Sequence, residues 1–129
     1  MIWLFAGIIM ATVVIDLITK FTFDGILNPG IAWGLGAQLP WLWIVIVIIS
    51  LVATVGLAVW YSRTSRRKSY WFTVGLALLI GGIIGNAVDR MVTGGAVHDF
   101  INFVIFRNNL ADIAITVGVI MVGGHVAFR

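Results

Sequence analysis

The acidic residues of this 129-residue chain are the ones best suited to catalyse a reaction, and all five are aspartates. Two carboxyl groups held close together share one proton, because two like charges at short range cannot both ionise. Such a pair can hydrolyse a peptide bond: the carboxylate activates a water molecule while the protonated partner polarises the carbonyl. Asp99 and Asp112 are the candidates for this pair.

Each of the two residues also has a structural interpretation. Asn109 stands three residues before Asp112, in NLAD, which is the spacing of a capping box at the start of a helix. Asp99, in AVHDF, could cap a short surface helix in the same way. A helix N-terminus would favour the anion of Asp112, and partial burial would favour the protonated form of Asp99. Spacing alone leaves both interpretations open.

A second group of polar residues follows two glycines near the end of an apolar run. Gly81 and Gly85 form a small-xxx-small pair that lets another helix approach closely. Asn86, Asp89 and Arg90 share one helical face by their spacing of three and four residues. Polar side chains at membrane depth are costly and usually face a cavity or a partner. The structural alternative is a packing seam that ends in an ion pair between Asp89 and Arg90.

The composition excludes several classes of protein. Hydrophobic residues make up 61% of the chain and charged residues 10%, which is too little polar surface for a soluble domain of this size. The chain has no cysteine, and His98 and His125 lack metal-ligand spacing, so we expect neither a metal nor a cofactor. The cationic cluster at 63–68 is flanked by apolar runs, which argues against a nucleic-acid partner.

Four apolar stretches are each long enough to cross a hydrocarbon layer of about 30 Å, which takes roughly 20 helical residues. Runs of this length exclude barrel strands, so the sequence predicts one all-α membrane domain over residues 1–129. Asp16 and Lys20 follow the first run where a signal-peptide cleavage site would stand, so we expect an uncleaved first span. The expected spans are about 1–18, 41–60, 70–88 and 111–128.

The loop at 61–69 sets the expected orientation. It carries four cations and no acid, and the positive-inside rule places such a loop in the cytoplasm. Both chain ends are then cytoplasmic, and the segments 19–40 and 89–110 lie outside. All five aspartates fall in these outer segments or at the adjoining ends of spans. This distribution predicts a single polar site at the outer face of the membrane.

The two outer segments have patterns of their own. Segment 19–40 alternates apolar and polar residues around Phe21 and Phe23 and contains four glycines, which is typical of strands with turns or bulges. We expect a small extracytoplasmic β-element there. The apolar run from Phe100 to Phe106 in the second outer segment is expected to lie in the interface as a short helix or strand.

Five ordered blocks of the sequence resemble the lipoprotein signal peptidases, the bacterial type II signal peptidases, which are aspartyl peptidases. No single block is specific, but all five in this order cover essentially the whole chain. They are Asp16–Lys20 (DLITK), Asn28–Gly34 (NPGIAWG), Gly81–Arg90 (GGIIGNAVDR), Val97–Phe100 (VHDF) and Asn109–Asp112 (NLAD).

The resemblance implies a role for each matching polar residue. Asp99 and Asp112 would be the catalytic pair, and Asp16 and Lys20 would support the site without taking part in the chemistry. Two departures stand out: Asn108 occupies a position where the family usually has an aromatic residue, and the stretch between the two catalytic aspartates is short. The residues implied to position the substrate or to orient the carboxyls are Asn28, Asn86, Arg90 and Asn109.

The resemblance also implies a substrate and a place. The substrate would be a prolipoprotein with a diacylglyceryl group on its lipobox cysteine, cleaved immediately before that cysteine. The enzyme would act as a monomer, in contact with membrane lipid, in the bacterial plasma (inner) membrane.

Two other functions compete with this one. A small ion or proton transporter would need polar groups through the membrane midplane, and the second and fourth spans have none there. A non-catalytic four-helix scaffold would need no reactive pair of acids, so conservative changes of aspartate would leave its function intact.

Overall fold

The computed structural model describes residues 1–31, 35–64, 69–103 and 105–128. Within these ranges four helices are long and apolar enough to cross a membrane, and four short strands form two antiparallel pairs. The predicted fold class, an all-α membrane protein with a small β-element, is confirmed. The helices are α1 (Ile2–Thr22), α2 (Leu42–Arg63), α3 (Tyr70–Thr93) and α4 (Leu110–Ala127), and the strands are β1 (Ile26–Asn28), β2 (Val97–Asp99), β3 (Ile101–Asn102) and β4 (Arg107–Asn108).

Three helices continue beyond the apolar runs that predict them, α1 to Thr22, α2 to Arg63 and α3 to Thr93. The polar residues in these extensions include Lys20 and Asp89, whose side chains are fully buried within the protein. Because these groups find partners inside the molecule, the helices can carry them past the apolar run. The cap of α3 is Gly94, with φ of 76° in the left-handed region that glycine adopts without strain.

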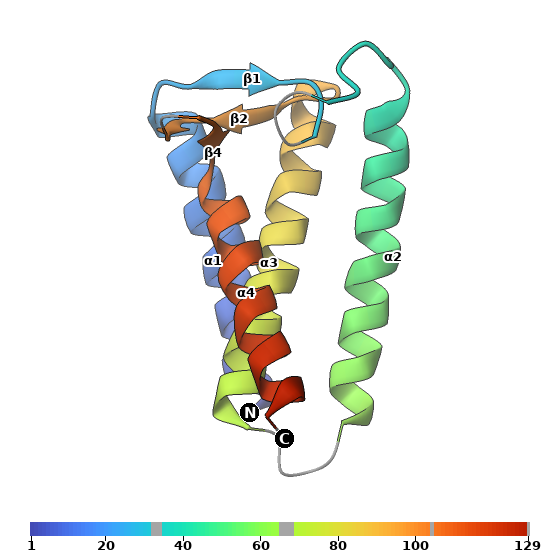
Figure 1. Cartoon of the computed structure of the whole chain (residues 1–129), viewed down its shortest axis with the longest axis vertical. Helices are drawn as coiled ribbons and strands as arrows, with labels where there is room; N and C mark the ends of the chain where they lie inside the picture. The colour runs from blue at the N-terminus through green and yellow to red at the C-terminus, as the bar shows by residue number, and fades with distance from the viewer. Residues whose placement is uncertain (32–34, 65–68, 104, 129) are drawn as a thin grey trace.

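The helices run up and down, and both chain ends lie at the end opposite the strands (Figure 1). α1, α3 and α4 pack together, while α2 stands beside α3 (Figure 1). Arg63 ends α2 at the end where the chain termini lie. The other three cations of the predicted cytoplasmic loop, Arg66, Arg67 and Lys68, lie outside the described residues, as do residues 32–34 of the second sequence block.

The two outer segments of the sequence meet in one β-sheet. β1 pairs antiparallel with β2, with Ile26 opposite Asp99 and Asn28 opposite Val97. A strand in segment 19–40 is therefore confirmed at Ile26–Asn28, but the alternation around Phe21 and Phe23 is not part of it, because Phe21 lies in α1 and Phe23 caps that helix. A cap of a surface helix is the wrong structural interpretation of Asp99, which lies in β2. The apolar run after it forms β3, which pairs with β4 and places Ile101 opposite Asn108.

Glycines on α3 let α1 approach closely. A Cβ at position 81 would lie 2.7 Å from the Cβ of Thr12, and one at position 85 would lie 2.5 Å from Oδ2 of Asp16. Both distances are too short for any larger residue, so the predicted close approach at Gly81 and Gly85 is confirmed.

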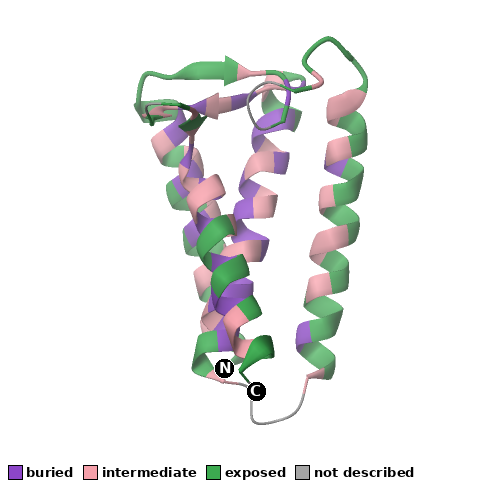
Figure 2. Ribbon diagram, viewed as in Figure 1, coloured by how far each residue is buried: buried purple, intermediate pink, exposed green. Residues whose placement is uncertain are grey.

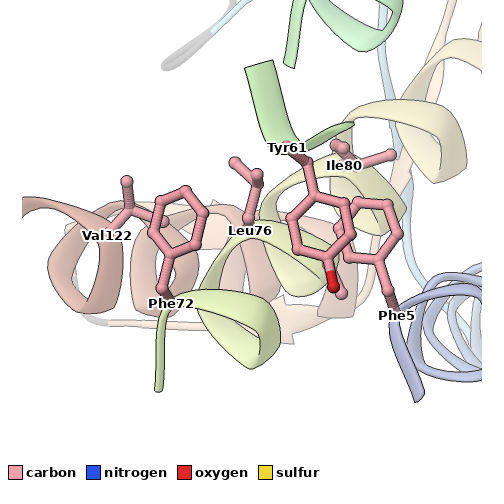
Figure 3. Packing of buried hydrophobic residues seen from close by; sticks show 7 residues of the cluster. Phe5, Tyr61, Phe72, Leu76, Ile80 and Val122 are labelled. Atoms are coloured by element: carbon pink, nitrogen blue, oxygen red, sulfur yellow. The ribbon is translucent and has the colours of Figure 1, made fainter. Parts of the chain in front are cut away.

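The apolar core lies toward the chain termini, away from the strands. The rings of Phe5 in α1 and Tyr61 in α2 stack with centroids 3.8 Å apart. Figure 2 shows that buried residues gather on α3, whereas α2 is mostly exposed, as expected of a helix that faces lipid. The cluster consists of Phe5, Tyr61, Phe72, Leu76, Ala77, Ile80 and Val122 (Figure 3).

Candidate active site

Asp99 and Asp112 line the same pocket, at the end of the molecule where the strands lie. Asp99 comes from β2 and is 4% exposed, while Asp112 stands half-buried in the first turn of α4. The pocket has a volume of about 160 Å³. Its other lining residues are Asn28, Ile31, Asn86, Arg90, Val97, Arg107, Asn108 and Asn109.

Asn109 connects the two carboxyl groups. Its side-chain amide donates to Oδ1 of Asp99 at 2.9 Å, and its side-chain oxygen accepts from the backbone N–H of Asp112 at 3.1 Å. Its own backbone N–H donates to Oδ2 of Asp112 at 3.2 Å, which completes the predicted capping box. The helix cap and the link between the carboxyls are therefore made by the same fully buried asparagine.

Asn28 holds the second oxygen of Asp99. The pairing of β1 with β2 brings its side chain to the pocket, where its amide nitrogen lies 3.2 Å from Oδ2 of Asp99. The same nitrogen donates to the carbonyl of Ile31 at 3.1 Å, and its oxygen accepts from the N–H of Gly30 at 3.0 Å. Both oxygens of Asp99 thus accept a hydrogen bond from an asparagine amide.

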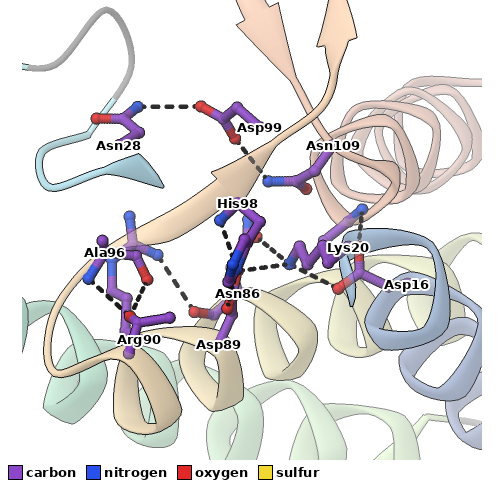
Figure 4. A network of polar contacts seen from close by, with 12 residues as sticks. Asp16, Lys20, Asn28, Asn86, Asp89, Arg90, Ala96, His98, Asp99 and Asn109 are labelled. Atoms are coloured by element: carbon purple, nitrogen blue, oxygen red, sulfur yellow. Dashed lines mark hydrogen bonds and ion pairs between the residues drawn. The ribbon is translucent and has the colours of Figure 1, made fainter. Parts of the chain in front are cut away.

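Asn86 on α3 holds Asp112. Lys20 on α1 in turn holds Asn86 (Figure 4). The Asn86 amide nitrogen donates to Oδ1 of Asp112 at 2.9 Å, and its oxygen accepts from Nζ of Lys20 at 2.9 Å. The Lys20 ammonium also pairs with Asp16 at 2.7 Å and with Asp89 at 3.7 Å. Because the oxygen of Asn86 faces a cation, its nitrogen must face Asp112.

Asp16 ties this buried ion pair to the helix that carries Asp112. Its Oδ1 accepts from the backbone N–H of Ala111 at 2.7 Å, in the first turn of α4. The predicted supporting pair, Asp16 and Lys20, does not line the pocket. It lies behind the pocket and joins α1 to the polar residues of α3 and to the start of α4.

Asp89 connects α3 to β2. Its Oδ2 accepts from the backbone N–H of His98 at 2.7 Å, and its Oδ1 lies 2.8 Å from Nδ1 of the same histidine. This contact anchors the strand one residue before Asp99. The spacing in the sequence predicts the helical face of Asp89 but not its contact with His98.

Arg90 lines the pocket and is 8% exposed. Its Nη1 donates to the carbonyl of Asn86 at 3.4 Å and its Nη2 to the carbonyl of Gly30 at 3.2 Å. Its buried Nε has no hydrogen-bond partner among the described residues. The ion pairs formed by the described residues do not include one between Arg90 and Asp89, so that part of the structural alternative is wrong, although its packing seam at Gly81 and Gly85 is present.

The surroundings of Asp99 favour its protonated form. Burial raises the pKa of its carboxyl above the ordinary value of 3.8, and the nearby charge of Asp112 acts in the same direction. The hydrogen bonds from Asn28 and Asn109 lower the pKa in part. The pocket therefore holds one buried carboxyl with a raised pKa, beside a second carboxyl in the first turn of a helix.

Two polar lining residues, Arg107 and Asn108, are not among the predicted site residues. Both lie in β4, and β4 reaches the pocket only because it folds back on β3. The stretch between the two aspartates contains no local pattern that predicts this hairpin. For Asn108 the available signals are that it directly precedes Asn109 and that it stands where the family usually has an aromatic residue.

Comparison with known proteins gives consistent matches over nearly the whole chain. The model of the signal peptidase (SPase) II family, Peptidase_A8, matches residues 3–128. The lipoprotein signal peptidase of Rhodopseudomonas palustris (strain TIE-1) is 38% identical over 131 residues, which cover 92% of this chain and 77% of that protein. The lipoprotein signal peptidase of Lactobacillus gasseri is 38% identical over 120 residues, covering 89% and 72%.

A solved structure of a bacterial membrane enzyme, obtained by the in meso method at 2.3 Å resolution, is similar in fold. It superposes with a TM-score of 0.78 at 27% sequence identity. The match covers 98% of this chain and 89% of that chain.

Proposed function

The chain belongs to the signal peptidase II family, the Peptidase_A8 peptidases, and we propose that it cleaves diacylglyceryl-modified prolipoproteins by a two-aspartate mechanism. Membership of the family makes it a peptidase that processes lipoproteins. One observation carries the mechanism: Asp99 and Asp112 line one pocket and are joined by Asn109. The cut falls immediately before the lipidated cysteine of the substrate.

In the proposed reaction Asp112 is the base and Asp99 is the acid. Asp112 removes a proton from a water molecule while the water oxygen attacks the scissile carbonyl carbon, and Asp99 donates its proton to the carbonyl oxygen. Asp112 then passes its proton to the leaving nitrogen and the C–N bond breaks. Collapse of the intermediate to the carboxylic acid returns a proton to Asp99, so the pair ends in its starting state.

The surroundings of the two carboxyl groups support the proposed division of roles. Burial favours the acid form of Asp99. Asp112 stands in the first turn of α4, where the helix dipole stabilises an anion. Asn28, Asn86 and Asn109 orient the carboxyls.

We assign Arg90 to substrate positioning. Its guanidinium lines the pocket, and Nη1 and Nη2 each donate to one backbone carbonyl. Each of these nitrogens carries a second N–H group, from which a substrate carbonyl in the pocket could accept.

The proposed location follows from the charge of the loop at 61–69. The positive-inside rule places this loop in the cytoplasm with both chain ends, and the strands and the pocket at the outer face of the plasma membrane. The lipid anchor of the substrate then lies in the bilayer beside the helices and delivers the scissile bond to the pocket. Anchoring supplies positioning that a soluble protease obtains from a deep cleft. The enzyme acts as a monomer.

The test is cleavage by the purified protein, in lipid bilayers, of one prolipoprotein with and without its diacylglyceryl group. We expect cleavage of the lipidated substrate alone, with a product that begins at the modified cysteine when its mass is measured. Equal cleavage of the unmodified substrate, or a cut at another bond, would overturn the proposed specificity.

A further inference from the structure

Asn108 lies beside the aspartate pair and has no part in the reaction proposed above. It is the last residue of β4, it is half-buried, and it lines the pocket. Its amide nitrogen lies 3.2 Å from Oδ2 of Asp112 and 2.9 Å from the carbonyl oxygen of Arg107. The amide takes this orientation because the reverse one would place its oxygen against two acceptors.

With Asn108 included, an asparagine amide nitrogen faces each of the four carboxyl oxygens of the aspartate pair. Asp112 also accepts the backbone N–H of Asn109, so it faces three N–H donors where Asp99 faces two. A charged carboxylate accepts such hydrogen bonds more strongly than a neutral carboxyl does. Hydrogen bonds of this kind therefore favour the charged form of a carboxyl.

We propose that Asn108 is a further positioning residue of the aspartate pair: its amide fixes the second oxygen of Asp112 and keeps this residue as the carboxylate that activates water. The proton of the pair then remains on Asp99. This inference rests on the proposed function and deepens it, since it selects the base and the acid through a residue that acts on Asp112 and not on the substrate.

A purely structural role for Asn108 makes a different prediction. Its amide also donates to the carbonyl of Arg107, which could serve only to shape the connection from β4 into α4. Loss of that contact would lower activity equally at every pH. Loss of the contact to Asp112 would instead make its ionisation harder, and the effect would be greatest in acid.

The experiment is the pH profile of kcat/KM for the purified full chain acting on a diacylglyceryl-modified prolipoprotein. In Asn108→Leu, which keeps the size of the side chain, we expect the acidic limb to move up by about one pH unit. In Asn108→Asp the added carboxylate should move it further. Asn102→Leu is the matched control, because this exposed asparagine on β3 does not line the pocket, and its profile should remain that of the parent.

An acidic limb that stays in place in both Asn108 variants, or activity that falls equally at all pH values, would overturn the inference. Asn108→Asp retains the shape and polarity of the side chain, so it decides the question if the leucine variant unfolds. Failure of this inference is distinct from failure of the proposed function. If only this inference fails, the pH profiles of the Asn108 variants stay in place and Asp112→Asn is inactive. If the proposed function fails, Asp112→Asn remains active.

Discussion

At the scale of single residues, the balance of forces on Asp99 can be tested through Asn28. Burial raises the pKa of the Asp99 carboxyl, and the hydrogen bond from Asn28 opposes part of that rise. Removing the bond in Asn28→Leu should raise the pKa further. Because Asp99 acts as the acid, activity is lost at the alkaline side where it gives up its proton.

We therefore predict that the alkaline limb of the kcat/KM profile moves to higher pH in Asn28→Leu, by up to about one unit. The two carboxyls are coupled, so the limb reports the pair and not one site alone. A limb that moves to lower pH would contradict the assignment of Asp99 as the acid.

Arg90 supports a second prediction at this scale. Its guanidinium bonds two backbone carbonyls from different segments, those of Asn86 and Gly30, and lysine cannot reproduce that fork of donors. Arg90→Lys should lower kcat/KM by roughly tenfold while retaining turnover, and Arg90→Ala should lower it further. A fully active Arg90→Ala enzyme, measured on purified protein, would leave Arg90 with no part in positioning the substrate.

At the scale of the elements, the buried ammonium of Lys20 joins α1 to α3, and its partner Asp16 reaches α4. Lys20→Met would leave Asp16 and Asp89 buried without their counter-charge. We predict a loss of roughly 3–5 kcal/mol in the free energy of unfolding, visible as a lower Tm in detergent. Arg63→Met is the control, since that cation is exposed at the end of α2. Equal Tm values for the two variants would show that the buried network does not hold the helices together.

The sequence could predict the helices because lipid imposes a simple requirement on them. A spanning segment must be long, apolar and helical, and each of the four runs meets that requirement by itself. The capping box of Asn109 and Asp112 is equally local. The pairing of β1 with β2 is not local, because its partners lie about 70 residues apart in the chain.

The same contrast explains what the sequence could and could not predict of the site. Motif resemblance selected six of the pocket residues, including Asn28 and Arg90. It gave no role to Asp89, whose partner His98 lies on a strand beyond the end of the helix. Arg107 and Asn108 were missed because their place in the pocket depends on the β3–β4 hairpin.

At the scale of the whole molecule, the polar network is confined to the end where the strands lie, while the described core toward the chain termini is apolar. This arrangement does not provide the polar path across the membrane that a transporter requires. It suits an enzyme whose chemistry takes place at one face.

The orientation of that face is a separate prediction. The cationic loop should be cytoplasmic, so a reporter fused after residue 65 should report a cytoplasmic location. Reporters fused after residue 36 or residue 95 should report an external one. The opposite pattern would place the pocket on the cytoplasmic side and contradict the proposed access of the substrate.

The central claim is that Asp99 and Asp112 act as one catalytic pair. Asn keeps the shape of Asp and can still cap a helix, but it cannot take a proton from water. Asp99→Asn and Asp112→Asn should each lower kcat by roughly a hundredfold to ten-thousandfold, while each variant remains folded and in the membrane. The double variant should be scarcely worse than either single one, because the two residues work as a unit.

The most direct measurement is therefore cleavage of a diacylglyceryl-modified prolipoprotein by these purified variants, after equal folding has been verified by their Tm. The exposed Asp24 serves as the control, and Asp24→Asn should cleave at the rate of the parent enzyme. Loss of cleavage in both single variants, with no further loss in the double variant, is the predicted result. Near-normal cleavage by either single variant in its folded state would contradict the two-aspartate mechanism.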